Sequence, residues 1–488
     1  MPDPSAVQQR KWLALALLTM AQFVVVLDAS ITNVALPSIG RDLNFVQDDL
    51  SWVVNSYILI FGGFLLLGGR MADLLGRRRM FIVGLGVFSV ASLAGGLSGE
   101  VNSQGLLIAS RALQGLGAAI LSPAALSIVT TTFAEGAERN KALGVWGAVA
   151  GSGGAAGVLL GGVLTEYLGW EWVLYVNVPI GIGAALLAPR LLLESRSQDA
   201  RRQFDAFGAL AVTLALCALV YGLVDANDAG WGSAQTIVLL ALAVVLLVAF
   251  VAIEQRTAHP LVPFRIFRSS TLTGSNIVGL LIGASLFSMF FFISLYMQQV
   301  LGYDALKAGL SYLPLALTII VSAGVASQLV TRVGFKPVLA VGMLVIAAGL
   351  LWFTQISVDG TFASDILGPS LLAAAGLGLA FVPVTIAATN GVSGQDAGLA
   401  SGLINTAQQV GGALGLAVLA TVASSRRTSV LEAAGGNPQA VPGALTESFQ
   451  AAFLTGAGIA ILGFLACVVL IRSEPHPEAA PEAVAATA

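Results

Sequence analysis

Residues 13–36 read LALALLTMAQFVVVLDASITNVAL, an apolar run that contains one carboxylate, Asp28. A helix of this length crosses a bilayer, because each residue adds about 1.5 Å of rise. A carboxylate inside such a span costs on the order of 3 kcal/mol, so we expect it to have a function. A second apolar run contains an arginine, Arg111. One acid and one base inside predicted spans indicate a protein that moves something across a membrane.

The composition points to a membrane protein along its whole length. The 488 residues are 57% hydrophobic and 10% charged, whereas a soluble domain has about 25% charged residues. The net charge of -3 gives no support for a nucleic-acid partner. Cys217 and Cys467 lie in apolar runs and are interpreted as small buried hydrophobes rather than a disulfide. Arg10 and Lys11 precede the first span without a small-residue cleavage site, so we expect this span to be retained.

Length and apolar continuity predict an all-α polytopic protein with fourteen transmembrane helices. The predicted spans are 13–36, 51–69, 80–98, 105–126, 142–164, 172–193, 206–224, 235–254, 273–300, 309–330, 337–357, 365–389, 399–423 and 449–471.

The basic residues predict the orientation, because cytoplasmic loops carry an excess of Lys and Arg. With both termini in the cytoplasm, Arg111 lies within a span and almost all other Lys and Arg residues fall in inner segments. The outer segments then hold only Arg41, Lys307, Arg426 and Arg427.

Internal similarity predicts two related halves. The segments Gly69–Arg77 and Ser327–Lys336 both place a small residue, a basic residue and a glycine in a short inner turn. The glycine-rich fifth span has a counterpart in the thirteenth, Gly402–Leu419. We therefore expect two six-helix bundles with two inserted helices, a common transporter plan.

The predicted units are an N-terminal bundle at 1–193, a linker with the inserted helices at 194–272, a C-terminal bundle at 273–472 and a disordered cytoplasmic tail at 473–488. Residues 194–205 and 424–448 are predicted linkers, inside and outside respectively.

Several motifs together resemble the fourteen-span drug:proton antiporters of the major facilitator superfamily. Leu27–Pro37 is similar to their first-span motif, Gly69–Arg79 to the inner-loop motif of the superfamily, and Leu106–Gly117 to its fourth-span motif. Asn177–Gly181 and His259–Phe264 are similar to further signatures of the fourteen-span group. The resemblance implies a major-facilitator-type fold and the export of drugs or antibiotics. It is specific to the family and names no substrate.

Asp28 and Arg111 are the predicted proton-coupling pair. Asp28 lies about 12 Å from the outer end of its span and Arg111 about 10 Å from the outer end of its own, so they can share one depth. A nearby cation favours the charged carboxylate, whereas burial favours the neutral one, and such a site can toggle. The alternative is a fixed ion pair that only holds two helices together. His259 and His476 fall in inner loops and do not compete for this role.

Charges at the inner face suggest a gate. Asp73 is expected to cap the positive N-terminal end of a helix in the other half and so hold the inner side shut. The alternative is that Asp73 is only part of a topology signal. The predicted gating set is Asp73, Arg70, Arg77, Arg78, Gly69 and Gly76.

Glycines line the fifth span, where the antiporter motif of the family falls. Small residues at this spacing let helices approach closely, and the residues that fit the motif are Gly153, Gly157, Gly161 and Gly162. Val158 replaces the usual proline, which argues against a kink there, and Glu171 replaces a usual basic residue. A phosphate loop is excluded because no Lys-Ser/Thr follows.

Polar and aromatic residues near mid-span are candidate walls of a substrate cavity, with ordinary packing as the alternative for each. They are Asn33, Trp52, Asn55, Tyr57, Gln114, Trp146, Phe291, Tyr296, Asn405 and Gln408.

The leading hypothesis is a proton-coupled antiporter that exports hydrophobic or amphipathic drugs or antibiotics across a bacterial plasma membrane. The alternative is a major-facilitator transporter of a polar metabolite, which needs more buried charges than Asp28 and Arg111. An enzyme is not expected, because the chain has no qualifying catalytic or metal-ligand motif, and no ATP-binding domain is present. The expected partners are a lipophilic small molecule, protons and the lipid bilayer, with no cofactor, no metal, no nucleic acid and a monomeric state.

Overall fold

The computed structural model describes residues 4–45, 50, 52–196, 205–257, 260–392, 396–435 and 437–472, and all regular elements in these ranges are helical. The predictions made for 197–204, His259, His476 and the tail 473–488 lie outside the described residues.

The N-terminal half consists of long apolar helices. They are α1 (Pro4–Asp42), α3 (Trp52–Leu75), α4 (Arg77–Glu100), α5 (Gln104–Thr132), α6 (Ala137–Tyr167), the short α7 (Trp172–Tyr175) and α8 (Asn177–Leu191). Two helices follow as the insertion, α9 (Ala206–Ala229) and α10 (Ala234–Arg256).

The C-terminal half repeats this plan. Its elements are α11 (Ser270–Leu295), which continues into the π-helical η2 (Tyr296–Val300), then α12 (Ala305–Ser311), α13 (Leu313–Val333), α14 (Phe335–Phe353), the π-helical η3 (Phe362–Leu367), α15 (Gly368–Thr389), α16 (Ala397–Ala433) and α17 (Val441–Leu470).

The predicted spans all coincide with these helices. Thirteen helices are long and apolar enough to cross a membrane, and a bent pair within α6 gives the fourteenth. Its two stretches, Ala137–Gly154 and Ala156–Tyr167, meet at 41°. The bend therefore forms although Val158 stands where the family has proline. The adjacent glycines Gly153 and Gly154 allow the helix to bend there.

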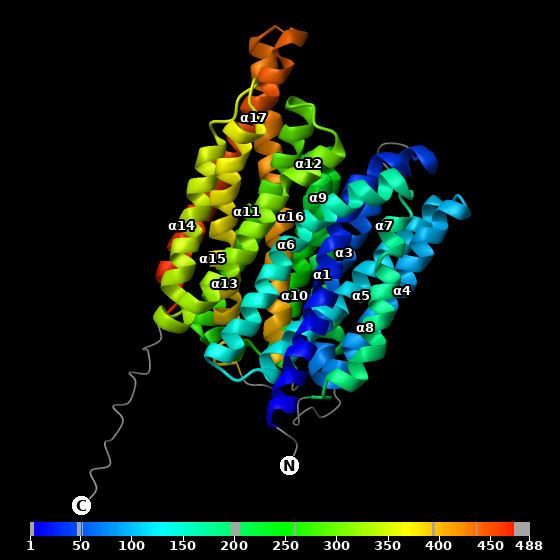
Figure 1. The fold of residues 1–488 in the computed structure, drawn as a ribbon, viewed down its shortest axis with the longest axis vertical. Helices are drawn as coiled ribbons and strands as arrows, with labels where there is room; N and C mark the ends of the chain where they lie inside the picture. Colours follow the sequence, from blue (N-terminus) through cyan, green and yellow to red (C-terminus); the bar gives the residue numbers. More distant parts are fainter. Residues whose placement is uncertain are drawn as a thin grey trace, which may run out of the picture.

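The expectation that 424–448 is a linker is wrong. Helix α16 continues to Ala433 and α17 begins at Val441, so most of this segment is helical. Its alanines favour helix, and Arg426 and Glu447 pair across the two helices at 2.7 Å. In Figure 1 this helical hairpin rises beyond the other helices at the top of the molecule.

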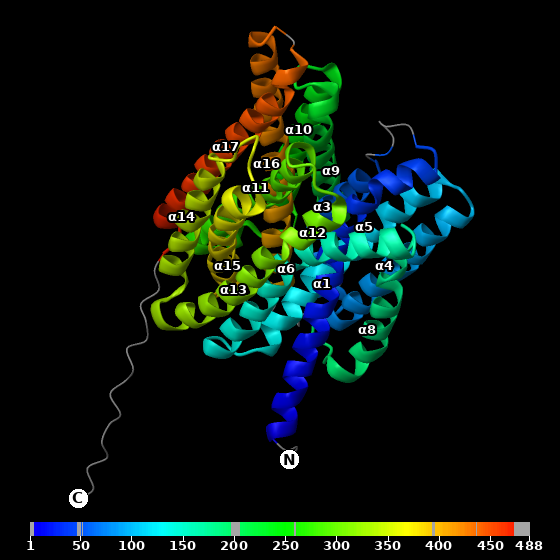
Figure 2. The same ribbon diagram turned by 45° about the horizontal axis from the view of Figure 1, so that its top comes forward.

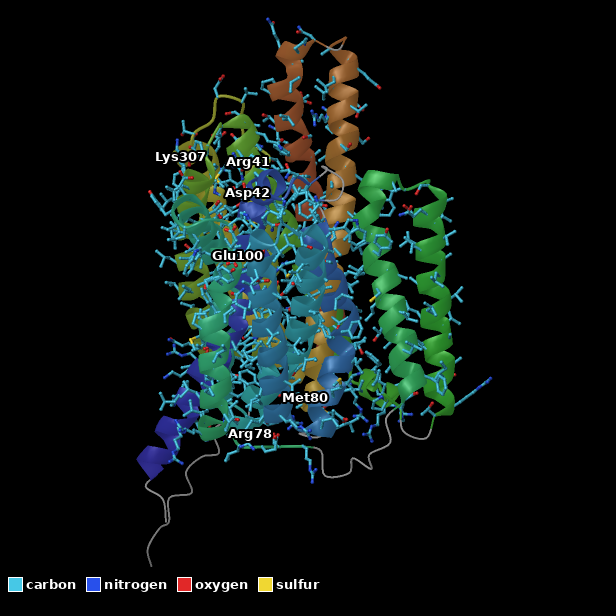
Figure 3. The ribbon with its side chains drawn as sticks, turned by 90° about the vertical axis from the view of Figure 1, so that its right-hand side faces the viewer. Arg41, Asp42, Arg78, Met80, Glu100 and Lys307 are labelled. Carbon is cyan, nitrogen blue, oxygen red and sulfur yellow. The ribbon has the colours of Figure 1, made fainter. Side chains whose placement is uncertain are left out.

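Two helical bundles and an inserted pair make up the body. Helix α9 packs against α3 of the first half and α16 of the second, while α10 packs mainly against α9. Figure 2 shows α9 between α10 and α3, and Figure 3 shows α9 and α10 standing at one side of the bundles. Only 17% of the residues in the most apolar stretch of α10 are buried, so most of this helix faces away from the rest of the protein.

Both ends of the described chain lie at one end of the molecule. The start of α1 and the end of α17 are at the lower end of Figure 1. In Figure 3, Arg78 lies at this end, whereas Arg41, Glu100 and Lys307 lie at the other. We call the end with the termini the inner end and the opposite one the outer end.

Candidate functional site

Asp28 and Arg111 form a fully buried ion pair. Helices α1 and α5 bring the two side chains together, with 2.5 Å between Arg111 Nη1 and Asp28 Oδ2. Both side chains have a relative exposure of 0%. The sequence analysis inferred only that the two residues share a depth. The contact between their side chains is a finding of the tertiary structure.

Neutral amides complete the surroundings of the carboxylate. Asp28 Oδ1 accepts hydrogen bonds from Gln114 Nε2 at 3.0 Å and Asn177 Nδ2 at 2.7 Å. Both amides also donate to Ser92 Oγ, at 2.7 Å and 3.5 Å respectively. The carboxylate thus accepts only from donors that belong to α5 and α8, and Ser92 of α4 positions these donors. We call Asp28, Ser92, Arg111, Gln114 and Asn177 the carboxylate cluster.

Arg111 is held by groups other than Asp28. Its Nε donates to the carbonyl of Val53 at 3.0 Å, and its Nη1 also donates to Gln114 Oε1 at 2.8 Å. The guanidinium lies over the ring of Tyr57, 4.6 Å from its centroid, a favourable cation–π contact. The hydroxyl of Tyr57 donates in turn to the carbonyl of Val25 on α1. The Nη2 of Arg111 is buried without a hydrogen-bond partner.

A buried pair of this kind depends on both members. Removal of one partner leaves an uncompensated charge in the interior and costs about 3–5 kcal/mol. Protonation of Asp28 removes the negative charge without removing atoms. The cluster therefore responds to one proton with a large change in its electrostatic balance.

Asp73 forms a second buried cluster at the inner end. Its Oδ1 accepts from Arg77 Nη2 at 2.7 Å and from the backbone nitrogen of Gly398 at 3.0 Å. Its Oδ2 accepts from the backbone nitrogen of Leu399 at 3.0 Å. Because α16 begins at Ala397, these amides belong to its first turn. The carboxylate of one half thus caps a helix of the other, as the sequence analysis expected, and its gating role stays a prediction.

Glycines allow the two halves to approach at this point. A Cβ at Gly69 would lie 2.5 Å from the carbonyl oxygen of Gly398 and 3.2 Å from Cα of Gly402. Both distances are too short for an unstrained contact. A side chain at Gly69 would push α3 away from α16 and stretch the hydrogen bonds of Asp73.

The other predicted gating residues lie near the junction between α3 and α4. Arg70 donates to the carbonyl of Pro260 at 3.4 Å. Gly76 has a φ of 109°, which favours glycine. The carboxylate of Glu194 accepts from the backbone nitrogens of Arg78 and Arg79 at 3.1 Å each. Glu194 therefore caps α4 and connects the start of the linker to the junction between α3 and α4.

A second contact between the halves lies at the inner end of α6. Asn140 donates to Thr331 Oγ1 at 3.1 Å, and Ser327 donates to the carbonyl of Asn140 at 2.8 Å. A Cβ at Gly144 would lie 2.6 Å from the Cβ of Ser327. The α3–α16 and α6–α13 contacts both join the two halves at the inner end.

The glycines of the antiporter motif face α1. A Cβ at Gly157 would collide with Ser30 Oγ and the carbonyl oxygen of Leu27, next to Asp28 in the chain. A Cβ at Gly153 would lie 3.0 Å from Val26, and one at Gly161 would lie 2.9 Å from the carbonyl of Ile31. Gly162 is buried in the same stretch. These positions let α6 lie close against the helix that carries Asp28.

The predicted cavity residues do not form one group. Tyr57 and Gln114 are buried beside Asp28 and Arg111. Trp52 contacts Tyr221 of the inserted α9, with ring centroids 5.4 Å apart. Tyr296 is 1% exposed, and its hydroxyl lies 2.9 Å from Asp365 Oδ2 near the outer end.

The remaining candidates differ in exposure. Asn33 and Phe291 are exposed, Asn55 and Asn405 are partly buried, and Trp146 and Gln408 are buried. Asn405 donates to the carbonyl of Ser401 in its own helix at 2.9 Å, and Gln408 Nε2 has no hydrogen-bond partner. Their assignment to a substrate cavity stays a prediction.

Three residues at these clusters are not among the residues predicted from the sequence. Asn177 belongs to a family signature without a predicted role, and Ser92 and Glu194 have no predicted role. A polar residue inside an apolar span is the signal that Asn177 and Ser92 share. Glu194 carries no such signal, because it lies in a polar segment.

Comparison with known proteins identifies the family. Residues 18–416 match the model of the Major Facilitator Superfamily. The chain belongs to this superfamily. Its members are transporters and not enzymes, in agreement with the sequence analysis.

Curated relatives match most of the chain. The cephamycin export protein CmcT of Amycolatopsis lactamdurans is 46% identical over 415 residues, which cover 84% of this chain and 85% of that protein. The puromycin resistance protein pur8 of Streptomyces alboniger is 40% identical over 484 residues, which cover 99% and 94%.

A solved structure supports the fold alone. The human organic anion transporter MFSD10 (TETRAN) aligns with a TM-score of 0.63 at 17% identity, over 96% of this chain and 100% of that chain. The all-helical major-facilitator fold predicted from the sequence is therefore confirmed.

Proposed function

We propose that this transporter is a proton-coupled antiporter that exports hydrophobic or amphipathic antibiotics or drugs. The substrate class rests on two relatives, whose names state cephamycin export and puromycin resistance. Within the described residues, no cluster of buried charges other than the Asp28–Arg111 pair lies between the two ends, whereas a polar metabolite would need one. This favours the exporter over the alternative transporter of a polar metabolite.

The observation that carries the coupling proposal is the carboxylate cluster. Asp28 is 0% exposed and accepts from one cation and two amides. These donors stabilise its charged form, whereas burial penalises that form. A conformational change that moves Arg111 or admits water shifts this balance, so the proton is bound in one state and released in the other.

The transport cycle follows from this exchange. Asp28 takes a proton from the outer side, and protonation weakens its pairing with Arg111. The two halves then rearrange, the Asp73 cap on α16 opens, and the proton leaves on the inner side as substrate enters. Return of the ionised protein carries substrate outward. The proton and the substrate thus bind at different times in the cycle, and the proton gradient supplies the free energy.

The proposed location is the plasma membrane of a bacterium, with both termini in the cytoplasm. The inner end has the basic loops that favour the cytoplasmic side. No cofactor is proposed, because the ion gradient provides the driving force, and the monomer contains all the residues used above.

The decisive experiment measures uphill transport in proteoliposomes with an imposed pH gradient. The assay takes a panel of cationic dyes, quinolones and natural-product antibiotics, and compares wild type, Asp28→Asn and the control Asp42→Asn. Asp42 is an exposed acid at the outer end of the same helix. We expect Asp28→Asn to lose gradient-driven transport to background and to retain passive exchange, while Asp42→Asn behaves as wild type.

Full gradient-driven export by the Asp28→Asn protein would refute the coupling role. The exposed Glu166 near the outer end of α6, or Asp225, is then the next carboxylate to replace.

A further inference from the structure

One hydrogen-bond acceptor of the carboxylate cluster has no donor within the described residues. Asn177 is 0% exposed and donates through Nδ2 to Asp28 Oδ1 at 2.7 Å. Its carbonyl oxygen Oδ1 is buried and accepts no hydrogen bond. A buried acceptor without a donor is unfavourable, so another orientation of the amide can be preferred in another state of the cluster.

The present arrangement fits an ionised Asp28. A charged carboxylate only accepts hydrogen bonds, and Arg111, Gln114 and Asn177 all donate to it. A protonated carboxyl group carries one O–H donor and then needs an acceptor. Protonation on Oδ1 also places that hydrogen against the NH2 groups that now face it.

The amides of Gln114 and Asn177 differ in their freedom to respond. Gln114 Oε1 accepts from Arg111 at 2.8 Å while its Nε2 donates to Ser92 at 2.7 Å, so both of its ends are held. Asn177 is held only through Nδ2, which donates to Asp28 Oδ1 at 2.7 Å and more weakly to Ser92 Oγ at 3.5 Å. The terminal torsion of Asn is broad and roughly two-fold, so a half-turn would exchange its NH2 group for its carbonyl oxygen.

We propose that Asn177 is a positioning residue that changes its amide orientation with the protonation of Asp28, donating to the carboxylate and accepting from the carboxyl group. This inference rests on the proposed proton coupling. Asn177 opens α8, directly after the short helix α7 that packs against α1, α4 and α6. The exchange therefore links the charge of Asp28 to the helix break at the sixth span.

Few charged or titratable groups compete for this role. Arg111 of α5 and Tyr57 of α3 interact with Asp28 electrostatically. Helix α4 contributes the neutral Ser92, α8 the neutral Asn177, and α6 lies against α1 through Gly153, Gly157 and Gly161. Within the described residues, Asn177 is thus the member of the cluster that has a free acceptor.

The test is the pH dependence of transport by Asn177→Leu, which keeps the size of the side chain and removes the amide. The control is Asn276→Leu on α11. Asn276 donates within its own helix to the carbonyl of Leu272 and also has an unpartnered Oδ1, so it shares this feature with Asn177 but not the contact with Asp28. Both variants are measured with wild type in proteoliposomes, as initial rates of exchange and of gradient-driven transport from pH 5 to 9.

We expect the pH midpoint of Asn177→Leu to move upward by about one pH unit. The ionised form loses a hydrogen bond to a charged carboxylate, which is stronger than the neutral hydrogen bond that the protonated form loses. The midpoint of Asn276→Leu should not move. An unchanged midpoint in Asn177→Leu, or an equal shift in Asn276→Leu, overturns the inference. If Asn177→Leu does not fold, Asn177→Ala takes its place because it also removes the amide, with the same expected direction and the same overturning result.

The outcomes separate this inference from the proposed function. If Asp28→Asn still exports against a gradient, the coupling proposal fails whatever Asn177 does. If Asp28→Asn is inactive and Asn177→Leu keeps the wild-type midpoint, only the role of Asn177 fails.

Discussion

Within the described residues, two buried aspartates are each paired with an arginine, and their surroundings differ in one decisive way. Asp28 accepts only from side chains, and all of them belong to the N-terminal half. Asp73 accepts from Arg77 of its own half and from two backbone amides of α16 in the other half. Neutralising Asp28 therefore alters the balance within one bundle, whereas neutralising Asp73 alters the contact between bundles.

This comparison assigns the two sites to different steps. A proton on Asp28 changes the pairing of helices around one carboxylate, which suits coupling. The cap on α16 is made and broken as the halves move, which suits gating. Variants at the two sites should thus fail in different measurements.

The largest effect is expected for Arg111→Ala. The variant leaves Asp28 buried without its cation, which should lower the free energy of unfolding by about 3–5 kcal/mol. It also favours the protonated carboxyl group, so gradient-driven transport should fall to background. The measurements are thermal unfolding in detergent and transport in proteoliposomes.

A matched control is the double variant Asp28→Asn with Arg111→Gln, which removes both charges. It should recover much of the stability and none of the coupled transport. If the double variant is as unstable as Arg111→Ala, the uncompensated charge is not the cause of the instability.

The next effect is expected for Asp73→Asn, which keeps the volume of the side chain. The first turn of α16 loses a negatively charged cap, worth about 1–2 kcal/mol. The closed inner end should therefore be less populated by about 5- to 30-fold, while export slows but stays dependent on the pH gradient. Closure is measured with cysteines at positions 140 and 331, whose native side chains touch across α6 and α13, in a background without Cys217 and Cys467.

Cross-linking of this pair should be slower in Asp73→Asn than in wild type. Equal cross-linking rates together with equal transport would reduce Asp73 to a topology signal.

A steric effect should distinguish the same two regions. Gly398→Ala places a Cβ against the carbonyl of Gly69 and the carboxylate of Asp73, and Gly157→Ala places one against Ser30 and Leu27. Each should cost about 1–3 kcal/mol through overpacking. We expect Gly398→Ala to slow the cross-linking of positions 140 and 331, and Gly157→Ala to lower thermal stability without that change.

The control is Gly86→Ala on α4, where a Cβ meets no atom within 4 Å. It should match wild type in both assays. The assignment of the two regions is wrong if Gly157→Ala and Gly398→Ala give the same pattern.

The mildest test leaves transport intact and asks which end faces the cytoplasm. Reporter fusions after Gly230, between α9 and α10, and after Gly435, between α16 and α17, should read as external. A fusion at the C-terminus should read as internal. An internal signal at Gly230 or Gly435 would reverse the orientation and exchange the two regions between membrane sides.

The sequence by itself determined the class of the protein, its spans and its two halves. Apolar runs of about 20 residues have one stable arrangement in a bilayer, because a helix satisfies its own backbone hydrogen bonds. It also identified Asp28, Arg111 and Asp73, because ionisable residues in or beside apolar spans are costly and stand out against them. Helix ends were less predictable, as 424–448 shows, since alanine-rich helix continues beyond the apolar core.

Only the tertiary structure decided which groups meet these charges. The partners of Asp28 come from 83, 86 and 149 residues away, and those of Asp73 from 325 and 326 residues away on α16. Such contacts depend on how helices are packed and rotated, and in a protein apolar on most sides the sequence carries little record of helix rotation. Packing therefore placed Asn177 with its unpartnered oxygen beside Asp28, and buried Tyr57 and Gln114 around the ion pair.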